Sequence, residues 1–244
     1  LSKTGNWMPI TMRVDRKPFD DVRVRQAMRL IVDRPQMVEQ ALGGFGRIAN
    51  DLCSPFDEMY ASSIPQRVQD IEQAKALLKA AGQSDLRVEL TTAPYADGMA
   101  QSAQVMAEQA KQAGVTIKLN KVDAGALYGP NYLKWTFSQD YWYTRSYIAQ
   151  AARTSTSDGT SNETHFANPE FDKLIKDAMG TLDDAKRKEI LLAAQKIEWE
   201  TGGLIIWGFF DMIDAYGPKV AGFKPAKSGI PMGNWGFWQM GTAA

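Results

Sequence analysis

Apolar residues recur at helical spacing in several stretches of the chain. The spacing of three to four residues predicts helices over residues 20–34, 70–82, 98–113, 168–180 and 183–202. In the first stretch the apolar face is formed by Val22, Val24, Ala27, Met28, Ile31 and Val32. Pro35 suits the first turn of a further short helix, which ends near Gly43.

Residues that begin and end helices lie at the bounds of these stretches. Asp70 with Gln73 three residues later resembles a capping box, and Gly82 suits the end of that helix. Asn168 followed by Pro169 is typical of a helix start. The bounds are therefore predicted by two independent signals, the apolar spacing and the capping residues.

Strand patterns alternate with the helices. Residues 86–92 and 115–122 alternate between apolar and polar side chains, and the apolar run at 204–210 predicts a buried strand that includes Trp207, Phe209 and Phe210. This order predicts an α/β fold in which long helices cover a small sheet. After Tyr216, which we also assign to the core, the chain is rich in glycine, proline and aromatic residues, so we expect an extended tail over another surface.

Composition narrows the classes of function. The 244 residues are 44% hydrophobic and 23% charged, as in an ordinary globular domain, and 28 basic side chains balance 28 acidic ones. No basic stripe exists that would attract nucleic acid, so we expect no nucleic-acid partner. No run of 18 apolar residues and no signal pattern occur, which predicts a soluble chain without a targeting segment.

Few residues suit metal binding or covalent catalysis. Cys53 is the only cysteine and His165 the only histidine, so neither a disulfide nor a three-histidine metal site can form. We expect Cys53 to be a buried, inert thiol and His165 to be a hydrogen-bonded structural residue. A G-x-S-x-G nucleophile motif is absent. The sequence thus predicts no catalytic residue, no metal and no cofactor.

Aromatic residues are concentrated in one short segment. Eight of them lie between residues 128 and 147, in a chain that is 10% aromatic overall: Tyr128, Tyr132, Trp135, Phe137, Tyr141, Trp142, Tyr143 and Tyr147. Residues 141–143 cannot all face one core if the segment is extended, because successive side chains point to opposite sides. We therefore expect at least one of these three rings to face solvent or a ligand.

The run KPFDDVRVRQAMRLIVDR at 17–34 resembles the signature of family 5 solute-binding proteins, which serve ABC importers of dipeptides, oligopeptides and nickel. Further segments are similar to that family in order and spacing: DIEQAKALLKAAG (70–82), GVTIKL (114–119), NPEFDKLI (168–175) and DDAKRKEILLAAQKI (183–197). The resemblance covers nearly the whole chain. Within the signature, we expect Asp20, Asp21, Arg23 and Arg25 to cap the helix and pair on its surface.

The resemblance implies a two-lobed protein of about twice this length. Residues 1–215 would be the second ligand-binding lobe, a periplasmic-binding-protein-like lobe of type II, cluster C, with a mixed sheet flanked by helices. Residues 216–244 would return as a tail to the N-terminal lobe, which lies outside this chain together with the signal peptide. Trp235, Phe237 and Trp238 would dock on that lobe. The implied location is periplasmic, and the implied partners are a peptide or other small solute and the membrane permease.

The resemblance also indicates a ligand-binding segment. Peptide-binding members carry Trp-x-x-Asp-Tyr, which Phe137, Asp140 and Tyr141 match, so Asp140 is the candidate partner for a ligand ammonium. Alternatively, Asp140 only caps a strand end. The pattern then departs from the family with Trp142 to Arg145, and the Arg145 guanidinium can receive a ligand carboxylate or pair with Asp140. The candidate ligand-binding residues are Phe137, Asp140, Tyr141, Trp142 and Arg145.

Three functions of different classes follow from these observations. The first is capture of a peptide, or of a polyamine, amino-acid derivative or oligosaccharide, for import. The second is a hydrolase that uses Asp140 with another carboxylate, such as Asp158 or Glu163. The third is a protein-interaction module whose aromatic tail binds another chain.

Overall fold

A five-stranded sheet forms the centre of the fold in the computed structural model, which describes residues 1–242. Its strands, in spatial order, are β5 (Thr116–Lys121), β4 (Arg87–Thr92), β6 (Phe137–Gln139), β2 (Ile10–Met12) and β7 (Leu204–Ile205). β4 pairs in parallel with β5 and β6, whereas β2 is antiparallel to β6 and β7. The carboxyl ends of β4, β5 and β6 therefore meet at one edge of the sheet, named here the carboxyl edge.

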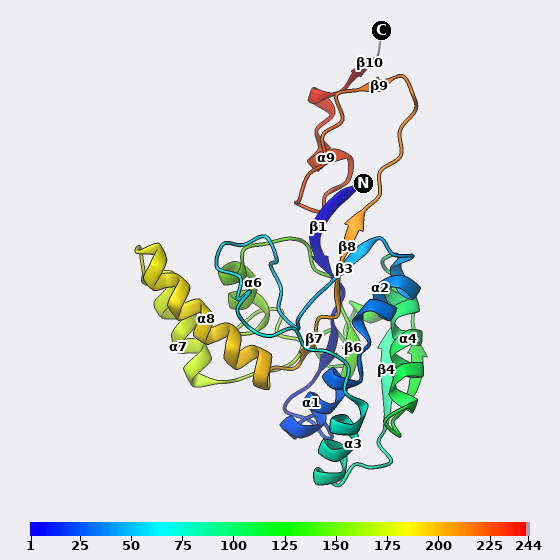
Figure 1. The fold of residues 1–244 in the computed structure, drawn as a ribbon, viewed down its shortest axis with the longest axis vertical. Coiled ribbons are helices and arrows are strands. Elements are labelled where there is room, and N and C mark those ends of the chain that lie inside the picture. Colours follow the sequence, from blue (N-terminus) through cyan, green and yellow to red (C-terminus); the bar gives the residue numbers. More distant parts are fainter. Residues whose placement is uncertain (243–244) are drawn as a thin grey trace.

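A second sheet begins at the carboxyl edge. It consists of β1 (Ser2–Trp7), β8 (Gly208–Met212) and β3 (Gly46–Ile48), with β8 in the middle and all pairs antiparallel. β1 leads into β2 and β7 leads into β8, so both strands extend away from the main sheet side by side (Figure 1). The single strand predicted over 204–210 is thus wrong in detail, because residues 206–207 separate β7 from β8.

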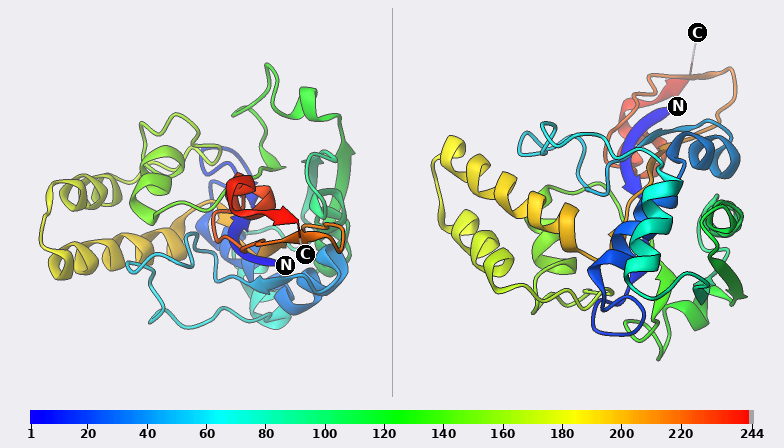
Figure 2. Two further views of the ribbon diagram at one scale, coloured as in Figure 1. Left: turned by 90° about the horizontal axis from the view of Figure 1, so that it is seen from above. Right: turned by 60° about the horizontal axis from the view of Figure 1, so that its bottom comes forward.

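Helices cover both faces of the main sheet. α1 (Val22–Ile31), α2 (Arg34–Leu42), α3 (Ile71–Ala80) and α4 (Met99–Lys111) enclose the larger hydrophobic core with the sheet. α6 (Tyr147–Thr154), α7 (Pro169–Gly180) and α8 (Asp184–Thr201) enclose a second core around Trp7, Trp142 and Phe171. α7 and α8 lie side by side and extend to the side opposite β4 and α4 (Figure 2). The predicted α/β class is confirmed.

Capping residues explain where these helices begin. The side chains of Asp70 and Asn168 accept hydrogen bonds from backbone N–H groups in the first turns of α3 and α7, as the sequence predicts. Asp33 caps α2 in the same way, and Gly43 ends that helix in the left-handed conformation with φ 58°. Local sequence signals therefore place these helix ends correctly.

The surface role predicted for Arg25 is wrong. Its side chain is buried, and its guanidinium donates to the carbonyl oxygens of Phe19 (2.6 Å) and Thr201 (2.5 Å). The fully buried Arg29 donates to the carbonyl oxygens of Gly202 and Leu204. Burial lowers the pKa of Arg25 to about 10 and that of Arg29 to about 9. Both cations satisfy carbonyl groups at the carboxyl end of α8, where the helix dipole is negative. Arg23, by contrast, pairs with Asp21 on the surface as predicted.

The tail forms a small unit beside β1, at the end of the molecule where the N-terminus lies (Figure 1). It contains β9 (Val220–Ala221), α9 (Pro231–Trp235), a 3-10 turn at Phe237–Gln239 and β10 (Gly241–Thr242). Asn6 Nδ2 donates to the carbonyl oxygen of Gly229 (3.1 Å), which joins the tail to β1. Tyr216 is 49% exposed, so its predicted core position is wrong. The last two residues of the predicted 216–244 tail lie outside the described residues. Within residues 1–242, no helix has the length and apolar character that a membrane crossing requires.

Candidate functional site

Five tyrosines gather at the carboxyl edge and are named here the tyrosine cluster: Tyr95, Tyr128, Tyr132, Tyr141 and Tyr143. Tyr95 follows β4, Tyr128 follows α5 (Ala124–Leu127) after β5, and Tyr141 follows β6. The ring centroid of Tyr95 lies 4.8 Å from that of Tyr128 and 5.7 Å from that of Tyr141. Parallel strands thus bring rings from three separate segments together, at the sheet edge where open α/β folds bind ligands.

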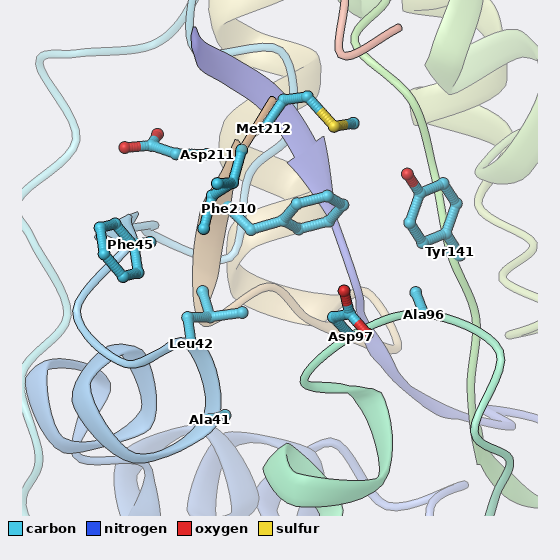
Figure 3. Close-up of a pocket in the computed structure, with 10 residues that line it drawn as sticks. Ala41, Leu42, Phe45, Ala96, Asp97, Tyr141, Phe210, Asp211 and Met212 are labelled. Atoms are coloured by element: carbon cyan, nitrogen blue, oxygen red, sulfur yellow. The ribbon is translucent and has the colours of Figure 1, made fainter. Parts of the chain in front are cut away.

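A pocket of about 280 Å³ lies next to this cluster. It is lined by Ala41, Leu42, Phe45, Ala96, Asp97, Tyr141, Phe210, Asp211, Met212 and Ile213. The ring of Phe210 points across the pocket toward Tyr141, and their centroids are 5.4 Å apart (Figure 3). The end of α2, the loop after β4, the segment after β6 and strand β8 each contribute to its wall. A mostly apolar cavity of this size suits a side chain of a small solute.

The charges at the pocket are acidic. Asp97 and Asp211 both line it, and Asp211 Oδ1 accepts a hydrogen bond from Arg47 Nη1 (2.9 Å). Asp97 is exposed and forms no ion pair with a described residue. The pocket therefore offers apolar surface together with a carboxylate for a cation.

Asp140 lies beneath the tyrosine cluster rather than in the open pocket. It is 3% exposed, and its Oδ1 accepts hydrogen bonds from Tyr128 Oη (2.7 Å) and the backbone N–H of Tyr141 (2.6 Å). Its Oδ2 accepts one from Tyr132 Oη (3.1 Å). Burial, reinforced by the nearby carboxylates, raises the pKa of both phenols, so they stay protonated donors at neutral pH. In this arrangement two phenol hydroxyls and one backbone N–H satisfy the Asp140 carboxylate.

Three other predicted residues lie away from the pocket. Phe137 is 1% exposed and packs against Phe19 in the core, with centroids 4.9 Å apart. Trp142 is buried and stacks on Trp7. Arg145 is exposed, and its Cζ lies 5.9 Å from the Trp142 ring rather than near Asp140. Of the five candidates, Tyr141 lines the pocket and Asp140 lies below it. The ligand contacts of all five stay predictions.

Several residues at the pocket are not among those predicted from the sequence. Tyr95 and Asp97 follow the strand predicted at 86–92. Ligands bind at the carboxyl ends of parallel strands, so the position of these two residues after a predicted strand could have indicated them. The sequence predicts Phe210 in the core with Phe209, yet the residue is only partly buried and faces the pocket. Its position at the start of the projecting part of β8 depends on the break at residues 206–207, which no local pattern indicates.

Asp158 and Glu163, the candidates for the second carboxylate of a hydrolase, lie in different parts of the fold. Glu163 is buried, and its Oε1 lies 3.0 Å from Tyr132 Oη, the same hydroxyl that contacts Asp140. Asp158 is exposed and lines a separate depression beside α7. Within residues 1–242, no three His, Cys, Asp or Glu side chains are grouped to hold a metal ion.

Cys53 is buried, and burial is the chief cause of the raised pKa of its thiol, which agrees with an inert thiol.

Comparisons with known proteins agree on the family. Residues 1–169 match the family model described as bacterial extracellular solute-binding proteins, family 5, middle. The glutathione-binding protein GsiB of Escherichia coli (strain K12) is 24% identical over 229 residues, which cover 88% of this chain and 44% of GsiB. The chain therefore spans less than half the length of this curated relative.

Solved structures share the fold. The oligopeptide-binding protein AppA of Bacillus subtilis, in complex with a nonapeptide, is similar with a TM-score of 0.81 and 21% identity, over 99% of this chain and 51% of AppA. A dipeptide-binding protein of Pseudoalteromonas sp. SM9913, in complex with Met-Leu, gives a TM-score of 0.80 and 21% identity, over 92% of this chain and 46% of that one. Together with the family match, these findings show that the chain belongs to the bacterial extracellular solute-binding proteins of family 5.

Proposed function

We propose that residues 1–215 form the second lobe of the solute-binding component of an ABC importer, which encloses a peptide or similar small solute between two lobes. The observation that carries this proposal is the acidic, aromatic pocket at the carboxyl edge, directly beside the strands β1 and β8. The protein would work in the periplasm, deliver the solute to a membrane permease and perform no catalysis.

Strand β8 links the pocket to the proposed closing motion. Phe210 and Asp211 belong to the pocket wall and also to the strand that extends beside β1 away from this lobe. If both strands continue into the first lobe, a hinge motion about them moves one wall of the pocket relative to Tyr141. The aromatic side chains Trp235, Phe237 and Trp238, which are 54%, 55% and 76% exposed, would pack against that first lobe.

A ligand with an ammonium group and an apolar side chain fits this site best. The ammonium would bind at Asp140, and the side chain would occupy the pocket between Phe210 and Tyr141. The ligands named for three similar proteins support a peptide as the solute, because glutathione, Met-Leu and a nonapeptide are all peptides. A polyamine would use the same carboxylates, and an oligosaccharide would use the rings without needing the charge.

Calorimetric titration of the full-length protein with a set of dipeptides, polyamines and oligosaccharides tests the proposal. Peptide binding should weaken about 30-fold or more in Asp140→Asn, because loss of one partner of a buried charge pair costs about 2–5 kcal/mol. Asp85→Asn, an exposed carboxylate in the turn after α3, is the matched control. Selective binding of oligosaccharides, or peptide binding that Asp140→Asn leaves unchanged, would refute the proposed ligand class.

A further inference from the structure

A hydroxyl group with one hydrogen lies between two buried carboxyl groups. Tyr132 Oη is 3.1 Å from Asp140 Oδ2 and 3.0 Å from Glu163 Oε1. It can donate its single hydrogen to only one of them. If both carboxyl groups were ionised, the second would face a lone pair of the phenol oxygen at hydrogen-bond distance, which is repulsive. The geometry therefore favours one additional proton at this pair.

Glu163 has fewer donors than Asp140, with the indole N–H of Trp142 as the one donor besides Tyr132 that acts on it among the described residues. Asp140 already receives hydrogens from Tyr128, Tyr132 and the backbone of Tyr141. Glu163 is 5% exposed, and its Oε2 has no hydrogen-bond partner among the described residues. A cavity of about 10 Å³ is lined by Glu163 together with Asp140 and Tyr132, and it has room for about one water molecule. An ionised Glu163 would be a poorly compensated buried charge.

The neighbouring cations are engaged elsewhere. Arg13, from the segment after β2, forms an ion pair with Asp15 and donates to the carbonyl oxygen of Leu133. His165 also contacts that carbonyl oxygen. From α6, Arg153 donates to Ser161 and lies over the Trp142 ring, where Arg145 lies as well.

The electrostatics of the pair agree with this geometry. Neither Glu163 nor Asp140 forms an ion pair with a described Arg, Lys or His. Burial, then the negative charge of Asp140 and its close side-chain contact, raise the pKa of Glu163 well above its usual range, although the donors Tyr132 and Trp142 oppose the rise. The protonated form of Glu163 is thus favoured by both its surroundings and the hydrogen count.

We propose that Glu163 carries a proton in the solute-free protein and releases it when an ammonium group of the solute binds at Asp140. This inference rests on the function proposed above. In the free protein, the Glu163 hydroxyl donates to Tyr132 Oη, which donates to Asp140. The solute ammonium replaces Tyr132 as the donor to Asp140, Tyr132 turns its hydrogen to Glu163, and the Glu163 proton passes to solvent. The site keeps one net negative charge before and after binding.

Glu163 is therefore a positioning residue that couples solute binding to pH. Because a proton is released, the affinity for a cationic solute should rise as the pH rises toward the pKa of Glu163. An uncharged solute would not draw the proton away. Asp140 would hold the ammonium, while Glu163 would favour ligands that bring a full positive charge.

Infrared spectroscopy tests the resting proton without any ligand. The full-length protein at neutral pH should show a carbonyl band of a buried protonated carboxyl group that Glu163→Gln lacks. Gln has an amide N–H that can donate to Tyr132 Oη as the protonated Glu163 does, so the variant should fold. Glu72→Gln, an exposed carboxylate on α3, should leave the spectrum of protonated groups unchanged. A Glu163→Gln difference spectrum without this band would overturn the proposal.

Titration calorimetry with Met-Leu as the probe tests the release. At one pH, in buffers of different ionisation enthalpy, the full-length protein should release about one proton per peptide, and Glu163→Gln should release none. Peptide binding without proton release would overturn this inference but leave the proposed function standing. If Met-Leu and other peptides do not bind while the infrared band is present, the proposed proton exchange and the peptide function are both overturned. The resting proton on Glu163 would still be supported by the band.

Discussion

Asp51 provides a test of how the segment between β3 and α3 is held. Its carboxylate is 1% exposed, and its Oδ2 accepts hydrogen bonds from Arg34 Nη2 (2.6 Å) and Arg67 Nε (2.8 Å). Its Oδ1 accepts one from the backbone N–H of Ile206, between β7 and β8. The Arg67 guanidinium also lies 3.8 Å from the ring centre of Trp199 on α8. One buried charge thus joins three parts of the chain.

We expect Asp51→Asn to destabilise the protein strongly. Asn tolerates the left-handed conformation of residue 51 (φ 56°), so the backbone can stay in place while the charge is lost. Two buried guanidinium groups would then lack their counter-ion, which costs about 3–5 kcal/mol. For a chain of this size, that loss corresponds to a melting temperature lower by about 6–20 °C.

Thermal unfolding followed by calorimetry or circular dichroism at pH 7 measures this effect. The matched control is Glu72→Gln, which breaks the exposed pair with Lys75 (2.9 Å) and should cost less than about 1 kcal/mol. A melting temperature for Asp51→Asn close to that of the control would refute the reasoning, since it would mean that Arg34 and Arg67 are compensated without this carboxylate.

Three further predictions concern the pocket and pH. Gly98→Ala should lower the melting temperature and weaken solute binding, because residue 98 has φ +86° and its new Cβ would lie 2.7 Å from the carbonyl oxygen of Ala41 at the pocket. Thermal unfolding and titration calorimetry measure the two effects, and an unchanged melting temperature and affinity would contradict the expected strain. Tyr141→Leu should weaken peptide binding about 2- to 12-fold through loss of the ring contact with Phe210, measured by the same titration, and an unchanged affinity would place the ligand elsewhere. Burial raises the pKa of Glu198 in the folded state, so its contribution to stability is complete below about pH 4.3 and is lost as the pH rises through the folded pKa. The stability of Glu198→Gln relative to the native protein should therefore increase with pH, and a constant difference in free energy of unfolding would exclude this assignment.

Local signals in the sequence predict the helices well and the short strands poorly. Capping residues such as Asp70 and Gly43 act within one turn, so they can be recognised without knowledge of the fold. Strand β1 (SKTGNW) has no apolar alternation, yet the polar side chains of Thr4 and Asn6 are buried and hydrogen-bonded. For example, Thr4 Oγ1 donates to the carbonyl oxygen of Phe210, 206 residues away. A local sequence pattern cannot indicate a hydrogen-bond partner that is so far away along the chain.

The site shows the same division between local and distant causes. The excess of aromatic residues after residue 128 points to the segment that forms part of the pocket wall. Tyr143 is exposed, so at least one of the three rings at 141–143 faces solvent, as predicted, whereas Trp142 lies in the core. The burial of Asp140 could not be predicted, because it depends on how the loop containing Tyr128 and Tyr132 folds back over the end of β6.

The tyrosines have two distinct physical roles. Tyr128 and Tyr132 act through their hydroxyl groups, which donate to Asp140 and stabilise its charge. Tyr141 contributes its ring to the pocket wall, and its hydroxyl is directed to Asn6 of β1 (3.3 Å). In the proposed exchange, a solute ammonium at Asp140 displaces the Tyr132 hydroxyl, whereas a solute that fills only the pocket displaces neither hydroxyl. The free energy of that displacement therefore favours ligands that carry a cation able to replace the Tyr132 donor.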